Sequence, residues 1–270
     1  MEDDLAIIGA GFMGSAIAET LLKRGYEGKI TVTRRTMEKL KELKGLGAKI
    51  TTNNKKAAKK SDIIFICVKP HQVEKVLNEI KEEIKGKLVI STAAIIPLSF
   101  YKKMVPKAFF VRIMPNVAVL VQESFTAYCC DSTASPEHKE KCEEILKLLG
   151  LCEEVEEKHM DAVTALSGSG PGYLSIIVEA LMYAGLKVGL PRELSLHSSA
   201  QTILGTGKLI LQTKDPNRVK DMVTTPGGTT IEAIYQLEGS QIRQALMKAV
   251  EDAAQKSEEI RRNWEANKKG

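Results

Sequence analysis

The sequence predicts an α/β protein, in which a doubly wound, mainly parallel sheet at the N-terminus is followed by an all-helical region. Short apolar runs alternate with amphipathic segments from Leu5 to about Val155, and several of these runs are apolar throughout. Continuous apolar runs are expected for parallel strands that are buried on both faces. After about Glu157 the strand pattern ends and only helical periodicity remains. We therefore expect two domains, residues 1–157 and residues 158–270.

Each predicted strand of the first domain is a short run rich in apolar or β-branched residues. In chain order these runs are residues 5–8, 29–33, 49–51, 62–68, 88–91, 109–114 and 126–129. Helical periodicity lies between them, at residues 15–24, 37–46, 73–84 and 136–149. Strands that alternate with helices in this way build doubly wound sheets.

The second domain is predicted to contain helices only. They are expected at residues 160–166, 172–188, 192–212, 218–222, 230–237 and 240–268. Leu190-Pro191 and Asp215-Pro216 separate three of these helices, because proline ends a preceding helix and suits the first turn of the next.

Charge and composition exclude several classes of protein. The chain has 270 residues, 43% of them hydrophobic and 27% charged, with a net charge of +5, which favours a well-packed globular protein. The densest basic patch, residues 55–60 (KKAAKK), has no interleaved aromatic residues. We interpret it as a solvated helix face and expect no nucleic-acid partner.

The distribution of cysteine and histidine predicts a reduced, cytoplasmic protein without a metal site. The five cysteines are odd in number and none has metal-ligand spacing; the four histidines are scattered. The acidic start, Met1-Glu2-Asp3-Asp4, argues against a signal peptide. The longest apolar stretch, residues 174–186, is too short to span a bilayer, so no membrane partner is expected.

A glycine-rich turn after the first predicted strand indicates a dinucleotide site of the Rossmann type. Residues 5–14 (LAIIGAGFMG) read as a strand, then G-x-G-x-x-G, then the start of a helix, which is the context that this motif requires. Gly9 permits the tight turn, Gly11 lets a pyrophosphate approach, and Gly14 lets helix and strand pack closely. The predicted cofactor contacts in this turn are Gly9, Gly11, Phe12, Met13 and Gly14. The alternative is a glycine turn without a ligand.

The end of the second predicted strand favours NADP over NAD. An NAD enzyme usually places a carboxylate here to hold the ribose 2′-hydroxyl, whereas this chain has Arg34 and Arg35. A guanidinium can hold a 2′-phosphate through paired charge-assisted hydrogen bonds. We therefore predict NADPH as the preferred cofactor, with acceptance of NADH left open. The alternative is that both arginines are surface charges.

Further cofactor contacts are expected where later strands end, because the carboxyl ends of parallel strands face the ligand crevice. The small side chains of Ala93 and Ala94 would let a nicotinamide lie close to the backbone. The predicted contacts outside the glycine turn and the arginine pair are Asn54, Val68, Lys69, Pro70, Ala93 and Ala94.

A second anion site is predicted near the other end of the chain. Residues 223–230 (VTTPGGTT) form a tight turn that opens the amphipathic segment 231–237. The free N–H groups and the positive dipole end of a helix suit a carboxylate. Two anion sites so far apart in the sequence suggest a cofactor at one end of the chain and an acidic substrate at the other.

Over nearly its whole length the chain resembles the pyrroline-5-carboxylate reductases. The resemblance depends on the glycine turn, Val68-Lys69-Pro70, Met114-Pro115-Asn116, residues 165–171 (ALSGSGP) and residues 223–230. It implies a Rossmann domain joined to a helical dimerisation domain, in dimers that often assemble into a pentamer of dimers. It implies reduction of a cyclic imino acid, 1-pyrroline-5-carboxylate, to L-proline with NADPH, the last step of proline biosynthesis.

The resemblance also implies the roles of residues in the late turn. Thr225 and the N–H groups around Gly228 and Thr229 would hold the substrate carboxylate, and Thr230 would contact the ring nitrogen and aid its protonation. The implied substrate contacts are Thr225, Gly227, Gly228, Thr229 and Thr230, with Thr230 as the catalytic residue. A helix-capping role is the alternative for Thr230. The chain departs from the family pattern at Ile95, Val117, Ala118 and Gly172, and at Thr213 or Lys214 where an acidic residue is common.

Other functions fit the sequence less well. A β-hydroxyacid dehydrogenase shares the two-domain layout but places a lysine base on the helix after the domain junction, and this chain has none there before Lys187. A non-catalytic NADP-binding regulator would need only the glycine turn. The helical region could also be a lid on its own monomer, but helices apolar on more than one face, such as residues 175–186, favour a homodimer.

Overall fold

The computed structural model describes residues 2–269. Contacts group these residues into two compact units: a nucleotide-binding unit, which runs to Ser169 and resumes at Ala253, and a helical unit, Gly170–Asp252. The predicted boundary at residues 157 and 158 falls inside the first unit, because residues 158–169 pack with the sheet. That boundary stays a prediction about domain organisation.

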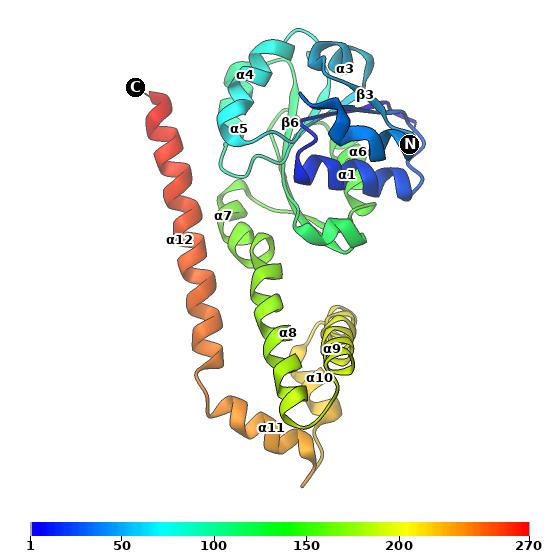
Figure 1. The fold of residues 1–270 in the computed structure, drawn as a ribbon. Coiled ribbons are helices and arrows are strands. Elements are labelled where there is room, and N and C mark those ends of the chain that lie inside the picture. Colours follow the sequence, from blue (N-terminus) through cyan, green and yellow to red (C-terminus); the bar gives the residue numbers. More distant parts are fainter. Residues whose placement is uncertain (1, 270) are drawn as a thin grey trace. The chain divides into compact units, whose positions relative to one another are not determined.

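The nucleotide-binding unit is built on one sheet, which confirms the predicted fold class. The strands lie in the order β3-β2-β1-β4-β5-β6-β7-β8, and Figure 1 labels β3 and β6 of this sheet. Their bounds are β1 (Leu5–Ile8), β2 (Ile30–Thr33), β3 (Lys49–Thr51), β4 (Ile63–Ile66), β5 (Leu88–Ser91), β6 (Phe109–Met114), β7 (Ser124–Cys130) and β8 (Gly150–Glu154). All neighbours are parallel except β6 and β7. In a sheet of this order the ligand crevice lies between β1 and β4, where the strand order reverses.

Three details of the sheet differ from the prediction. Strand β7 (Ser124–Cys130) extends beyond both ends of the predicted run 126–129. Strand β8, with the sequence GLCEE, was not expected; only Cys152 of its side chains is buried. An edge strand that exposes carboxylates lacks the apolar signal from which strands are predicted. Strand β4 is shorter than expected and ends at Ile66, so Cys67 and Val68 lie in the loop that follows it.

Helices cover both faces of the sheet (Figure 1). They are α1 (Phe12–Lys23), α2 (Lys41–Gly45), α3 (Asn54–Lys60), α4 (Pro70–Ile80), α5 (Leu98–Met104), α6 (Pro136–Lys147) and α7 (Met160–Val163), with short 3₁₀ turns at Met37–Leu40, Val117–Val121 and Glu157–His159 and a π-helix at Thr164–Gly168. Alternate strand residues enter opposite cores: Leu5 and Ile7 pack with α1 and α6, whereas Ala6 and Ile8 pack with α3, α4 and α5. Each fully buried leucine or isoleucine side chain of these strands contributes about 1.5–3 kcal/mol.

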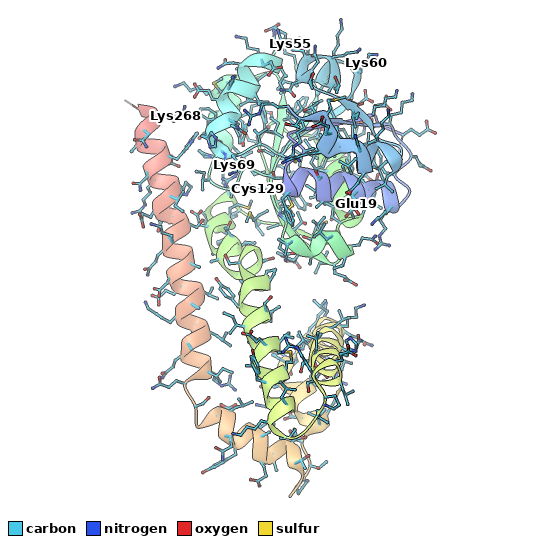
Figure 2. The ribbon with its side chains drawn as sticks, in the orientation of Figure 1. Glu19, Lys55, Lys60, Lys69, Cys129 and Lys268 are labelled. Atoms are coloured by element: carbon cyan, nitrogen blue, oxygen red, sulfur yellow. The ribbon has the colours of Figure 1, made fainter. Side chains whose placement is uncertain are left out.

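Helix α3 confirms the interpretation of the basic patch. Ala57 and Ala58 face the core, and the four lysines of residues 55–60 are exposed. Figure 2 shows Lys55 and Lys60 extending outward from the unit. The patch is thus the solvated face of an amphipathic helix.

The last part of α12 (Ile242–Lys269) also belongs to the nucleotide-binding unit. Trp264 packs edge-on against Phe100, with ring centroids 4.9 Å apart. Arg261 Nε and Ser257 Oγ donate to the Asp161 carboxylate at 2.7 and 2.8 Å. The sequence alone does not show these contacts, because their partners are about a hundred residues or more away in the chain.

The helical unit consists of α8 (Gly170–Lys187), α9 (Arg192–Thr213), α10 (Pro216–Val223), α11 (Thr229–Glu238) and the first part of α12. Pro191 directly precedes α9 and Pro216 begins α10, which confirms the predicted breaks. Only Met182, Ser195 and Val219 are buried in this unit, all of whose residues are described. Among residues 2–269, no helix is long and apolar enough to cross a membrane.

Candidate functional site

The glycine turn has the geometry that the motif predicts. Gly9 has φ +94°, a conformation that favours glycine, and a Cβ there would lie 2.4 Å from Val68 Cγ1. A Cβ at Gly14 would lie 2.5 Å from the Gly9 carbonyl oxygen, whereas one at Gly11 would meet nothing within 4 Å. Gly9 and Gly14 are therefore required by packing, and Gly11 borders open space where a phosphate group can approach.

Helix α1 begins directly after this turn. It starts at Phe12, three residues earlier than predicted, and Gly11 occupies the N-cap without a side-chain hydrogen bond. Its first turn contains no acidic residue, and the Phe12 side chain is 64% exposed. The first N–H groups of the helix thus remain available for an anion.

The two arginines after β2 have different surroundings. Arg34 Nη1 donates to the Ala10 carbonyl oxygen at 2.8 Å, so it supports the glycine turn. The Arg35 side chain is exposed, and within residues 2–269 it has no hydrogen-bond or ion-pair partner. Arg35 is thus the freer of the two to bind a 2′-phosphate.

One cavity of about 740 Å³ joins most of the predicted contacts at the switch point of the sheet. The predicted residues that line it are Gly9, Gly11, Arg34, Arg35, Asn54, Val68 and Lys69. Asn54 is held in place, since Thr33 Oγ1 donates to its Oδ1 at 2.7 Å and its Nδ2 donates to Glu79 at 3.0 Å. A second cavity, of about 800 Å³, lies along the edge strand β3, away from the carboxyl ends of the strands.

Sequence reasoning missed one wall of the first cavity. Gln72, Lys75, Val76 and Glu79 of α4 line it, at the i, i+3, i+4, i+7 spacing that marks one helix face. This signal was present in the sequence. Helix α4 begins at Pro70, three residues earlier than predicted, and this earlier start adds Gln72 to the face.

The remaining predicted cofactor residues do not line this cavity. Phe12 and Met13 begin α1, Gly14 packs against the turn, and Pro70 begins α4. Ala93 and Ala94 follow β5, with Ala93 buried and Ala94 half-buried. Ala93 N donates to Ser91 Oγ at 3.2 Å.

The thiols in the nucleotide-binding unit are buried or half-buried, and burial raises their pKa values. All five cysteines are free. Burial raises the pKa of Cys67, beside the cavity, to about 12, and that of Cys130 to about 11. Because the thiolate is the nucleophilic form, these cysteines do not supply a nucleophile near neutral pH.

The predicted substrate turn lies in the helical unit and is a type II turn. Gly228 N donates to the Thr225 carbonyl oxygen at 3.0 Å, Pro226 is the second residue, and Gly227 has φ +67°, as this turn type requires. A Cβ at Gly228 would lie 2.4 Å from Thr225 Oγ1. The turn thus explains why residues 226–228 read PGG.

Helix α11 opens at Thr229 with free donors. Its N-cap is Gly228, without a side-chain cap, so Thr230 is not the capping residue. The N–H groups of Thr229 and Thr230 have no helical carbonyl before them and no partner outside the helix among residues 2–269. The hydroxyls of Thr225, Thr229 and Thr230 have no hydrogen-bond partner in the part of the chain described here. This is a compact cluster of donors suited to a carboxylate.

A glycine turn at the switch point, a free arginine beside it and a separate donor cluster define a dinucleotide-dependent oxidoreductase. Two family models match the chain. One, described as NADP oxidoreductase coenzyme F420-dependent, matches residues 4–95, and one for pyrroline-5-carboxylate reductase dimerisation matches residues 157–260. A pyrroline-5-carboxylate reductase of Methanosarcina acetivorans is 39% identical over 262 residues, which cover 95% of this chain and 97% of the relative. The chain belongs to the pyrroline-5-carboxylate reductase family.

Solved structures agree with this assignment. A pyrroline-5-carboxylate reductase of Coxiella burnetii superposes with a TM-score of 0.90 at 33% identity, covering 96% of this chain and 99% of that one. The Plasmodium falciparum pyrroline carboxylate reductase, solved with NADP bound, has a TM-score of 0.83 at 32% identity. The match covers 94% of this chain and 97% of that one. The family, the fold class and NADP as cofactor are thereby confirmed.

Proposed function

We propose that this chain transfers hydride from NADPH to the C=N bond of 1-pyrroline-5-carboxylate and releases L-proline, the last step of proline biosynthesis. The observation that carries the proposal is the composition of the donor cluster. Residues 225–230 offer hydroxyl and N–H groups but no carboxylate or imidazole. A protonated imine is already a strong electrophile, so such a site needs to orient the substrate rather than supply a strong acid.

The glycine turn fits the cofactor, because a side chain at Gly9 or Gly14 would fill it and Gly11 leaves its approach open. Bound there, NADPH supplies the hydride from nicotinamide C4 to the imine carbon. Arg35 would hold the 2′-phosphate, and this preference makes NADH the poorer cofactor. The Lys69 side chain, which is exposed and has no hydrogen-bond or ion-pair partner within residues 2–269, would contact a phosphate at the same edge.

The substrate carboxylate would be held by Thr225 Oγ1 and the N–H groups at the start of α11. Thr230, two residues into the helix, would donate to or orient the ring nitrogen and so aid its protonation. These assignments rest on the free donors of the turn together with the family pattern. Residues 165–171 and 223–230 carry that pattern most strongly.

Thr230→Ala and Thr230→Ser test this role as a matched pair. Loss of a positioned proton donor should lower kcat about 100-fold or more in the alanine variant, while the serine variant keeps the hydroxyl and most of the rate. Equal turnover in both variants and the parent enzyme would show that Thr230 has no part in the reaction.

The activity itself is tested by following NADPH absorbance with 1-pyrroline-5-carboxylate and measuring the proline formed. Repeats with NADH and with a six-membered cyclic imino acid define the cofactor preference and the ring size accepted. Absence of proline formation with either cofactor would overturn the proposal.

The helical unit leads us to propose a homodimer as the minimal assembly. Its large apolar side chains are exposed in the single chain, Ile176, Val188 and Tyr235 among them, and the match to the dimerisation model covers this unit. That match begins at residue 157, which supports the domain boundary proposed from the sequence. A pentamer of dimers is the larger assembly that a solution mass would reveal. The free cysteines favour a cytoplasmic location.

A further inference from the structure

A buried polar cluster lies beneath the loop that carries Ala93 and Ala94. The loop joins β5 to α5, and Arg112 of β6 pairs with Ser91 at the end of β5. Arg112 is only 2% exposed and is the largest fully buried side chain in the described residues. We call Ser91, Tyr101, Arg112 and Glu157 the Arg112 cluster.

The Arg112 cluster fixes the loop at three points. At its start, Ser91 Oγ accepts from Ala93 N and forms a 2.6 Å hydrogen bond with Tyr101 OH. In its middle, Arg112 Nη2 donates to the Ala94 carbonyl oxygen. At its end, Glu157 accepts from Leu98 N at 2.8 Å and from Arg112 Nη1. The guanidinium is thus the group that joins the middle of the loop to its end.

This arrangement is costly for the fold. A buried guanidinium loses its hydration, and a buried ion pair is strongly destabilised when one partner is removed. Well-packed apolar residues in place of the whole pair often give a protein that is equally stable or more stable. Arg112 Nε is buried without a hydrogen-bond partner in the described residues. Stability alone therefore explains the presence of the Arg112 cluster poorly. Its contacts with the loop backbone offer another reason for it.

The effect on the backbone follows from peptide geometry. In a planar trans peptide the C=O and N–H groups point in opposite directions. Because Ala94 O points at the buried guanidinium, the N–H of Ile95 points away from it. That N–H has no hydrogen-bond partner in the described residues. The loop follows the carboxyl end of β5, on the side of the sheet where ligands bind.

We propose that Arg112 is a positioning residue that orients the Ala94–Ile95 peptide, so that the Ile95 N–H donates to the carboxamide oxygen of the nicotinamide. The inference rests on the proposed function only in placing the nicotinamide end of NADPH at this loop. It assigns Glu157 the supporting role of holding the guanidinium and the start of α5. It also explains how a site can tolerate Ile95, since only the backbone of that residue is used.

The test compares two ligands, NADPH and 2′-phosphoadenosine 5′-diphosphoribose, which lacks the nicotinamide. Dissociation constants are measured by titration calorimetry for the parent enzyme and for Arg112→Lys, which keeps the charge but not the two-pronged geometry. We expect Arg112→Lys to weaken NADPH about 10-fold, the loss of one hydrogen bond to a positioned donor, and to leave the second ligand unchanged within about twofold.

Glu157→Gln should give a smaller shift in the same direction, and it serves if Arg112→Lys does not fold. Asp131→Asn is the matched control: Asp131 is also buried and accepts from Phe110 N, but at the other end of β6. It should destabilise the protein without separating the two ligands. Equal weakening of both ligands by Arg112→Lys and Glu157→Gln, or no weakening, overturns the inference. If the parent enzyme reduces the imine and the variants give that result, only the inference is refuted. If the parent enzyme fails to bind NADPH, the proposed function is refuted as well.

Discussion

The two units of this chain bury their apolar residues in different ways. The nucleotide-binding unit packs two cores against the two faces of one sheet, with side chains such as Ile7 and Phe65 fully buried. The helical unit buries only Met182 and Val219 among its apolar residues and exposes many large ones. The first unit therefore finds its stabilising contacts within one chain, whereas the second needs a surface that one chain does not provide.

The candidate sites of the two units differ in the same sense. Around the nucleotide cavity Arg34 and Asn54 are held by internal hydrogen bonds, whereas the side chains of Arg35 and Lys69 are exposed and have no partner in the described residues. In the turn at residues 225–230 the hydroxyls and the first N–H groups of α11 have no partner in the described residues. The predicted cofactor site is thus partly preorganised, whereas the predicted substrate site keeps its donors free for a ligand.

The largest effect is expected from a substitution that disrupts contact between the helical unit and a partner chain. Ile176 of α8 is 68% exposed, and Ile176→Glu would place a carboxylate in each half of a twofold interface. Since burial of an unpaired charge costs several kcal/mol, we expect the dimer dissociation constant to rise more than about 100-fold and activity to fall with it. Light scattering measures the mass.

Leu46→Glu is the control for this change, because Leu46 is 43% exposed in the nucleotide-binding unit. It should leave the mass unchanged. If Ile176→Glu has the same mass as the parent protein, the exposed helical face has no partner and the contrast between the units fails.

A pair of glycine variants separates packing from ligand access within the nucleotide-binding unit. Gly9→Ala combines a positive φ with a 2.4 Å contact, so its free energy of unfolding should fall by about 2–4 kcal/mol. Gly11→Ala meets nothing and should change stability by less than about 1 kcal/mol while weakening NADPH about 10-fold or more. Urea unfolding and NADPH titration measure both. Equal loss of stability in the two variants would contradict the described turn.

The two arginines after β2 should respond differently. Arg35→Ala should weaken NADPH about 10- to 100-fold, because it removes charge-assisted hydrogen bonds to the 2′-phosphate, and leave NADH unchanged. Arg34→Ala should weaken both cofactors, since Arg34 supports the Ala10 carbonyl. Steady-state KM values for the two cofactors measure the difference. A loss confined to NADPH in Arg34→Ala alone would reverse the assignment.

The smallest effect is a pH dependence of stability in the nucleotide-binding unit. His138 stacks on Phe109 and bonds to Ser135 in a capping box, and burial lowers its pKa. The unfolded chain then takes up the proton more readily than the folded chain does. The contribution of neutral His138 to the free energy of unfolding is therefore complete above the ordinary histidine pKa and is lost as pH falls through the lower pKa of the folded state.

His138→Gln should remove this slope, a change of less than about 1 kcal/mol because the ring is largely solvent-screened. Urea unfolding at several values between about pH 8 and about pH 5, a range that spans the ordinary histidine pKa, measures the pH dependence of the free energy of unfolding. An unchanged slope would assign the pH dependence to other groups.

Most of the fold could be predicted because its signals are local. Apolar runs mark β1 and β4, the glycine spacing marks the turn after β1, and the PGG sequence marks the type II turn before α11. Where a signal was weak the prediction was incomplete. Strand β8 carries carboxylates on the edge of the sheet, and α4 begins at Pro70 rather than at Val73, where the prediction placed its start. The contacts of α12 with Phe100 and Asp161 have no local signal at all.

The sequence by itself determined the sheet, the dinucleotide turn, the family and the residues offered to each ligand, because these depend on spacings of a few residues that a backbone must satisfy locally. Only the tertiary structure decided which donors are occupied and which are free. It placed Arg34 on Ala10, Arg112 under Ala94 and Glu157 between Arg112 and Leu98. Those choices join residues from separate strands and helices, and chain folding brings such residues together without leaving a repeat in the sequence.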